Sequence, residues 1–403
     1  MSGPLSGVRV LELTTIILGP WGAQILGDMG ADVIKIESPD GDPMRDVGPR
    51  QNEGMAAVYL NVNRNKRSLV LDLKQAPARD ALLRLIEGTD VFLHALRPPA
   101  IARLGLTYED LAPINPRLIY CGTHGYSKKG PYGDRGAYDD LIQGGSGMAA
   151  LLGRATGTPA YVPTVMADKT SSMAVALAVS MALFAREKSG EGQAIEVPMF
   201  ETMVAFTMVE HLFGETFIPS KGPAGYPRAL SPHRAPYKTK DGYIGVLPYN
   251  DRQWHSFFDM IGRTDMATDE RYATMASRLA NVDSIYGELR EAMATRTTAE
   301  WMTDLVAANV PATAINDLDE LFEDEHLKAV DFWRTFEHPS EGTLRMPDVF
   351  THFSETPGGL HRGPPRHGEH TAEVLAEGGL SETEIKALCE SGAAIQAAPI
   401  EET

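Results

Sequence analysis

The stretch GVRVLELTTIILGPWGAQILGDMGADVIKIE, residues 7–37, decides the fold. It begins and ends with short runs rich in Val, Leu and Ile, residues 7–13 and 31–37, which are typical of buried β-strands. Between them, residues 19–30 open at a Gly-Pro step and close at a glycine, as a helix does. A strand, a helix and a second strand in this order predict parallel strands covered by a helix.

Four further strand-like runs follow, and helical stretches lie among them. These runs span residues 68–74, 89–96, 118–125 and 194–200. Repeated alternation of this kind predicts an α/β fold in which helices cover a parallel sheet.

The composition and the predicted secondary structure of the chain change after about residue 205. Residues 219–236 are rich in Pro, Gly and basic side chains, helical patterning dominates residues 251–327, and short strands and turns follow. A last helix is predicted to start at Ser381, with Glu384 in capping-box spacing, before a frayed tail over residues 393–403.

These changes predict a divided chain. The expected parts are the N-terminal part of a large domain over residues 1–205, a linker over 206–236, a smaller domain over 237–330, and a segment over 331–403 that returns to the large domain.

Bulk composition excludes several classes of protein. The 403 residues include 37 Lys and Arg against 54 Asp and Glu, and the net charge of −17 disfavours a broad nucleic-acid or anionic-membrane surface. Two cysteines cannot form a disulfide scaffold or a Cys-rich zinc site. The sequence shows neither a signal-peptide pattern nor an apolar run of membrane-spanning length. We therefore expect a cytoplasmic protein without nucleic-acid or membrane partners.

Common catalytic and nucleotide-binding motifs are missing from the sequence. The loop after the first strand has no G-x-G-x-x-G, and neither a P-loop nor a G-x-S-x-G elbow occurs. His361, His367 and His370 lie in or beside a Pro/Gly-rich loop and fit no metal-binding helix, so we expect surface histidines and no metal site.

Two acidic positions precede predicted helices. Asp168 stands before a long apolar helix, where its carboxylate is expected either to cap the helix or to serve as an anionic nucleophile beside free N–H groups. Asp139 and Asp140, which directly follow Tyr138, are expected to cap the helix that begins after them.

Basic residues form three local clusters despite the acidic total. They are Arg64, Lys66 and Arg67; Arg97 and Arg103; and Lys128 and Lys129. Loops at the carboxyl ends of parallel strands share one crevice, so the clusters predict either a common phosphate site or ordinary solvated charge.

Seven stretches together resemble one known family. Besides residues 7–37 they are NRNKRSLVLDLK, LRPPAIARLGLTYEDL, INPRLIYCGTHGYSKKGPY, AYDDLIQGGSGM, FAREKSGEGQAIEVPMFE and HGEHTAEVL. In this order and spacing they resemble the class III CoA-transferases, the CaiB/BaiF family of formyl-CoA transferase and carnitine CoA-transferase.

This resemblance implies a fold and an activity. The fold is a Rossmann-like large domain built from both chain ends, plus a smaller α+β domain, in an interlocked homodimer. The activity is transfer of CoA from an acyl-CoA to a carboxylic acid, with CoA as substrate and with no tightly bound cofactor or metal. Asp168 matches the nucleophile, which forms an aspartyl mixed anhydride and then an aspartyl-CoA thioester.

The resemblance also implies contacts with the substrates. Positions that match the CoA site of the family are Ile17, Leu18, Leu71, Lys74, Arg97, Arg103, Tyr138 and Asp139. Ser38, the Ala95–Leu96 pair and the missing glycine-rich loop depart from formyl-CoA transferases and disfavour formyl or oxalate specificity. His233 and Arg234 are expected to pair a second carboxylate, which suggests a small dicarboxylic or hydroxy acid.

Two alternatives remain beside the transferase. An α-methylacyl-CoA racemase needs a base on each face of the α-carbon, and that branch has a histidine where this chain has Tyr138. A non-catalytic acyl-CoA binder would have no use for a nucleophile at Asp168. Both residues therefore favour the transferase.

Overall fold

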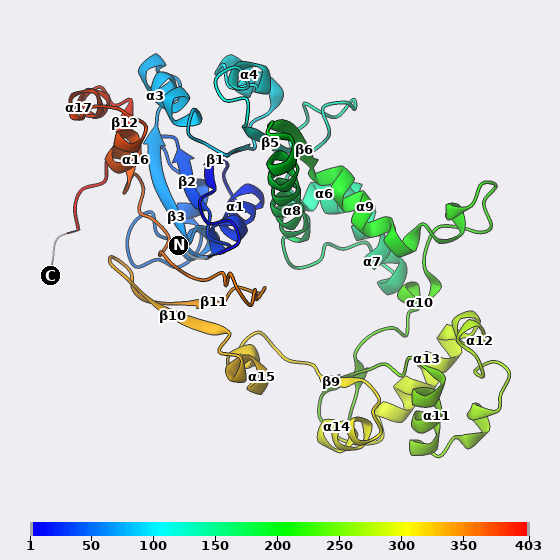
Figure 1. The fold of residues 1–403 in the computed structure, drawn as a ribbon. Helices are drawn as coiled ribbons and strands as arrows, with labels where there is room; N and C mark the ends of the chain where they lie inside the picture. Colours follow the sequence, from blue (N-terminus) through cyan, green and yellow to red (C-terminus); the bar gives the residue numbers. More distant parts are fainter. Residues whose placement is uncertain (1–2, 401–403) are drawn as a thin grey trace. The chain divides into compact units, whose positions relative to one another are not determined.

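A computed structural model describes residues 3–400 and contains a seven-stranded sheet (Figure 1). The strand order is β12-β3-β2-β1-β4-β5-β6. The strands are β1 (Arg9–Leu13), β2 (Asp32–Glu37), β3 (Lys66–Leu71), β4 (Val91–His94), β5 (Ile119–His124), β6 (Gln193–Pro198) and β12 (Ala394–Ile395). The six predicted strands are all present and parallel, and the protein is an α/β protein.

The seventh strand corrects two expectations, the wholly parallel sheet and the frayed tail. β12 pairs antiparallel with β3, so the sheet is mixed and contains both ends of the chain. The amide of Asp72 donates to the Ala393 carbonyl at 2.9 Å, and Ala393 and Ala394 are buried. Figure 1 shows β12 and α16 (Thr371–Glu377) beside β3.

Helices cover this sheet, as the alternating pattern predicts. They are α1 (Leu18–Asp28), α2 (Ala57–Val62), α3 (Ala76–Ile86), α4 (Pro98–Arg103), α5 (Tyr108–Leu111), α6 (Asp139–Gly145), α8 (Met166–Ser189), α16 and α17 (Glu382–Glu390), with the 3-10 turn η1 (Pro43–Asp46). Helix α9 (Met199–His211) follows β6 and extends into the second compact unit described below. Helix α17 starts with the predicted capping box between Ser381 and Glu384. A core of buried aliphatic side chains, including Leu11, Ile34 and Leu69, joins the sheet to these helices.

Helices α1 and α8 pack closely against each other. A Cβ at Gly22 would lie 3.1 Å from the Ser172 carbonyl, so glycine allows the two backbones to approach. At its far end, α8 is anchored by Arg186, which pairs with Asp90 at 2.8 Å, just before β4 begins. That end lies at the amino edge of the parallel strands, and the start of α8 therefore lies toward their carboxyl edge.

The chain divides into two compact units. The first contains the described residues up to 146, residues 163–205 and those from 326 onward; the second contains residues 147–162 and 206–325. The hairpin of β10 (Trp333–His338) and β11 (Gly342–Pro347) lies in the first unit. Residues 147–162, expected with the large domain, cluster with the second unit because Arg154 donates to the Ala224 carbonyl at 3.2 Å and α7 (Met148–Thr156) contacts α10 (Pro227–Leu230).

The second unit has its own core. Besides α7 and α10, its elements are η2 (Phe213–Thr216), β7 (Tyr237–Lys238), β8 (Tyr243–Val246), α11 (Asp251–Met260), η3 (Thr264–Ala267), α12 (Met275–Ala280), α13 (Val282–Met293), α14 (Thr298–Ala307), β9 (Ala312–Ala314) and η4 (Glu320–Phe322). Helix α15 (Glu325–Ala329) spans the boundary between the two units. Strands β7, β8 and β9 form a three-stranded antiparallel sheet, and Trp254, Phe257 and Trp301 are buried in the core. In the part of the chain that the structure describes, no helix has the length and apolar character needed to cross a bilayer.

Candidate active site

Asp168 lies in the first turn of α8 and is buried, with 8% of its surface exposed. The helix begins at Met166, and its N-cap is Val165, whose side chain makes no capping bond. The expectation that Asp168 is the N-cap residue is therefore wrong, because the carboxylate stands three positions later.

The cap of α8 comes instead from another helix. The Asp168 amide donates to Oδ1 of Asp139 at 2.9 Å, so the first residue of α6 satisfies a free N–H at the start of α8. Oδ2 of Asp139 accepts from Nε2 of Gln143 at 2.7 Å, and the same Gln143 nitrogen donates to the Thr164 carbonyl at 3.2 Å. Asp139 thus holds the turn that carries Asp168, and does not cap its own helix as expected.

Burial and a neighbouring charge determine the protonation of Asp168. Burial, followed by the negative charge of Asp139, raises the pKa of the Asp168 carboxyl from 3.8 to about 7. The stabilisation expected from the helix N-terminus is outweighed, since both causes favour the neutral acid. A carboxyl that titrates near neutral pH is typical of functional sites.

The loop after β1 lies against the same turn. Oγ of Ser172 donates to the Leu18 carbonyl at 2.7 Å and to the Asp168 carbonyl at 2.8 Å. Ile16 adopts the left-handed region, with φ of 72°, and its amide donates to Oδ1 of Asp42 at 3.2 Å. Leu18 and the neighbouring Ile17, both predicted CoA contacts, are therefore held at the start of α1, next to the Asp168 turn.

A cavity of about 620 Å³ lies at the carboxyl ends of β1 to β4. Among the residues that line it are Leu71, Lys74 and Arg103, all predicted CoA contacts, together with Ser38 and Leu96. Open α/β sheets bind their ligands at this edge. The structure thus brings together three of the predicted contacts, which are far apart in the sequence.

The other five predicted CoA contacts, Ile17, Leu18, Arg97, Tyr138 and Asp139, do not line this cavity. Arg97 is exposed just before α4 and makes one long bond to the Asp134 carbonyl, at 3.5 Å. Tyr138 is the N-cap residue of α6, directly before Asp139, and 67% of its surface is exposed. Tyr138 and Asp139 lie at the start of α6, next to the turn that carries Asp168, whereas Arg97 lies between β4 and α4.

Both expectations for the first basic cluster, a common phosphate site and ordinary solvated charge, are wrong. Arg64, Lys66 and Arg67 are buried and paired with Asp28, Glu12 and Asp32 at 2.8, 2.7 and 2.6 Å. Lys66 is the first residue of β3, so the cluster belongs to the amino end of that strand. Lys128 and Lys129, after the carboxyl end of β5, are exposed.

Two buried histidines at strand ends were not anticipated. His94 ends β4 and His124 ends β5, with ring centroids 5.5 Å apart. Burial lowers their pKa values to about 3 and about 4, so both rings are neutral. The only signal in the sequence was that each lies near the carboxyl end of a predicted strand of a parallel sheet.

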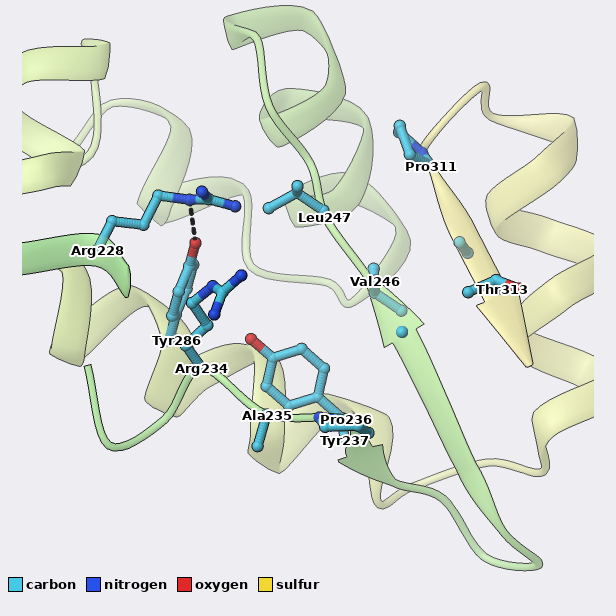
Figure 2. A pocket seen from close by; sticks show the side chains of 12 residues that line it. Arg228, Arg234, Ala235, Pro236, Tyr237, Val246, Leu247, Tyr286, Pro311 and Thr313 are labelled. Atoms are coloured by element: carbon cyan, nitrogen blue, oxygen red, sulfur yellow. Dashed lines mark hydrogen bonds between the residues drawn. The ribbon is translucent and has the colours of Figure 1, made fainter. Parts of the chain in front are cut away.

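The second unit contains the remaining predicted residues, His233 and Arg234. Arg234 lines a cavity of about 490 Å³ together with Arg228 and Tyr286 (Figure 2). His233 does not line it; its Nδ1 lies 3.1 Å from a guanidinium nitrogen of Arg290. Arg228 was missed because it lies in a stretch with several basic residues and no motif distinguishes it from the others.

The histidines near the C-terminus were expected to lie on the surface. Among residues 3–400, no three His, Cys, Asp or Glu side chains are grouped so that they could hold a metal ion. The expectation of surface histidines is wrong for His370, which is buried between the Ser68 amide at 3.3 Å and Arg362 at 2.7 Å.

A family model described as CoA-transferase family III matches residues 5–371. The chain belongs to this family. It is similar to the succinate–glutarate CoA-transferase of Agrobacterium fabrum, with 36% identity over 390 residues that cover 93% of this chain and 95% of the relative. It is also similar to the succinyl-CoA–L-malate CoA-transferase beta subunit of Chloroflexus aurantiacus, with 32% identity over 387 residues, 93% of this chain and 94% of the relative.

A solved structure agrees with this assignment. The CaiB/BaiF family protein from Brucella suis superposes with a TM-score of 0.78 at 32% identity, covering 94% of this chain and 100% of that one. The protein is therefore a class III CoA-transferase, an enzyme of a family that acts on acyl-CoA substrates.

Proposed function

We propose that this CoA-transferase moves CoA between small dicarboxylic or hydroxy acids through covalent intermediates on Asp168. The observation that carries the proposal is the buried carboxyl of Asp168 in the first turn of α8, with its pKa raised to about 7. The backbone amide and carbonyl of this residue are bonded by Asp139 and Ser172. The two curated relatives described above are named for dicarboxylic acids, succinate with glutarate and succinate with malate.

The first half of the reaction would use up the donor. The Asp168 carboxylate attacks the thioester carbonyl of the donor, the C–S bond breaks, and CoA leaves as thiolate with an aspartyl anhydride left behind. The thiolate then attacks the aspartyl carbonyl, releases the donor acid as carboxylate, and leaves an aspartyl-CoA thioester.

The second half repeats these steps in reverse order. The acceptor carboxylate attacks the aspartyl thioester and expels CoA thiolate, which attacks the acyl carbonyl of the new anhydride. The new acyl-CoA leaves and the Asp168 carboxylate is regenerated. No oxidation state changes, and each step exchanges one acyl bond for another of similar energy.

The CoA contacts are proposed on the same basis. Leu71, Lys74 and Arg103 share the cavity at the strand ends, where Lys74 and Arg103 would address phosphates and Leu71 would flank the pantetheine arm. Ile17, Leu18, Arg97, Tyr138 and Asp139 complete the proposed set. Three of these, Leu18, Tyr138 and Asp139, belong to the elements around the Asp168 turn.

We also propose the family's assembly for this chain. Two subunits would interlock, each made of the two compact units described above. Analytical ultracentrifugation of the purified protein tests this, since a monomer at micromolar concentration contradicts it.

A donor-by-acceptor screen tests the proposed activity. Purified protein is incubated with succinyl-CoA and a panel of acids, and new acyl-CoA products are identified by mass spectrometry. Asp168→Ala should abolish transfer and keep CoA binding, while Asp140→Ala, which changes the exposed neighbour of Asp139, should transfer normally. Near-normal transfer by Asp168→Ala would contradict the proposal, and exchange of the α-proton in heavy water without an acceptor would indicate a racemase.

A further inference from the structure

The cavity of about 490 Å³ in the second unit has an unusual distribution of charge. Its lining contains two arginines, Arg228 and Arg234, and no acidic side chain. Most of the remaining lining is apolar or aromatic: Ala235, Pro236, Tyr237, Val246, Leu247, Tyr286, Pro311 and Ala312. Two cations in a largely apolar cavity, in a chain with a net charge of −17, form a local site for an organic anion.

The structure fixes Arg228 in this cavity. Its Nε donates to the hydroxyl of Tyr286 at 2.8 Å, and Figure 2 shows this bond at the cavity wall. The other group that acts on the guanidinium is the hydroxyl of Tyr226. Arg228 is thus held by neutral hydroxyls, which orient the cation without cancelling its charge.

Arg234 faces the same space from the loop before β7. The charges of both Arg228 and Arg234 act on the buried hydroxyl of Tyr237, so all three groups lie close together. Arg228 is half-buried and Arg234 is exposed, and in the part of the chain covered by the structure neither guanidinium pairs with a carboxylate. Buried arginines elsewhere in the chain do pair with one, as Arg64, Arg186 and Arg278 show. Arginine that faces a cavity without an acidic partner is suited to pair a carboxylate of a ligand.

We propose that this cavity binds a carboxylate of a small dicarboxylic acid, the acceptor acid of the reaction, through Arg228 and Arg234. The apolar wall formed by Val246, Leu247 and Pro311 suits the methylene chain of such an acid, which favours it over inorganic phosphate. The identity of the acid rests on the proposed function; the presence of an anion site does not.

Direct binding to the full-length protein tests this proposal without turnover. Glutarate and the monocarboxylate butyrate are titrated calorimetrically against the wild-type protein and against Arg228→Gln, Arg228→Lys and Arg234→Gln. We expect each glutamine variant to weaken glutarate binding about tenfold, and to weaken butyrate binding as well, because either acid presents a carboxylate to the two arginines. Arg228→Lys should lose less than Arg228→Gln, because it keeps the charge.

The matched control is Arg252→Gln, which removes an exposed arginine of the same unit that does not line the cavity, and which should leave glutarate binding unchanged. Circular dichroism and thermal melting establish that each variant is folded. Unchanged glutarate affinity in folded Arg228→Gln and Arg234→Gln overturns the proposal. So does a loss of CoA affinity in place of glutarate affinity, since that would assign the arginines to a phosphate.

Failure of the proposed function gives a different result. Asp168→Ala should still bind glutarate with wild-type affinity, and this binding should still depend on Arg228. If no acid accepts CoA in the transfer screen while Arg228→Gln still weakens glutarate binding, the anion site stands and the acceptor assignment falls.

Discussion

The substitution Asp139→Asn should move the pH dependence of the enzyme. Asp139 raises the pKa of Asp168 by its negative charge, and its Oδ1 also accepts the Asp168 amide proton. Asparagine keeps an oxygen for that amide and removes the charge. The kcat/KM of wild-type enzyme should rise with pH through about 7, because only the ionised Asp168 attacks the thioester.

The expected decrease in the pKa of Asp168 follows from the two causes that raise it, burial and the charge of Asp139. The pKa of Asp168 moves from 3.8 to about 7, and burial contributes more than Asp139 does, so Asp139 accounts for less than about 1.6 pH units. A decrease of about one unit, or about 1.4 kcal/mol, is expected on removing its charge. Near pH 6 the ionised fraction of Asp168 would then rise from about a tenth to about a half, and relative kcat/KM about fivefold.

The assay is the pH profile of kcat/KM for a fixed donor and acceptor, each variant normalised to its own plateau near pH 9. Normalisation matters because loss of the Asp139–Gln143 hydrogen bond can lower the plateau without moving the midpoint. Asp140→Asn, which removes an exposed carboxylate one residue along, should keep the wild-type midpoint. A midpoint in Asp139→Asn that stays in place or moves upward refutes the electrostatic role of Asp139.

Three further changes test the remaining claims. The pKa of Asp168 is higher in the folded than in the unfolded chain, so the contribution of this residue to stability is present at acid pH and is lost as the pH rises through about 7. Between about pH 5 and 8, the free energy of unfolding of the wild-type protein should therefore fall by about 2–3 kcal/mol more than that of Asp168→Asn. Urea titrations that give the same pH dependence for both proteins would contradict this. Arg45→Met should cost about 3–5 kcal/mol because it leaves Glu37 buried and unpaired, whereas Arg50→Met, which breaks an exposed pair, should cost less than about 1 kcal/mol. Arg103→Gln should raise the KM for acyl-CoA about tenfold and leave kcat nearly unchanged, and a fall in kcat at unchanged KM would remove Arg103 from the CoA site.

Much of the sheet could be predicted because its strands are buried on both faces. Short runs rich in Val and Ile, such as residues 31–37, predict strands of a parallel sheet when helical stretches separate them. Strand β12 could not be predicted, since two residues, Ala394 and Ile395, carry no periodic pattern and pair through backbone atoms alone. The Ser381 capping box could be predicted from the sequence, because both of its partners lie within one helical turn.

Contacts between distant residues limited the prediction of the site. Asp168 could be placed before a helix, but its amide is capped by Asp139, which lies 29 positions earlier in another helix. The basic run at residues 64–67 could not be recognised as buried, because its acidic partners come from distant parts of the chain, such as Asp28 and Glu377. The sequence shows that a residue is charged, but only the fold shows which residue of opposite charge pairs with it.

Trapping the covalent intermediate tests the central claim most directly. Purified protein is incubated with succinyl-CoA in the absence of acceptor, quenched with hydroxylamine, digested, and sequenced by mass spectrometry. The account predicts a hydroxamate on Asp168 that depends on succinyl-CoA and is absent in Asp168→Ala. Transfer of CoA with no adduct at that carboxyl, or with the adduct on another side chain, contradicts it.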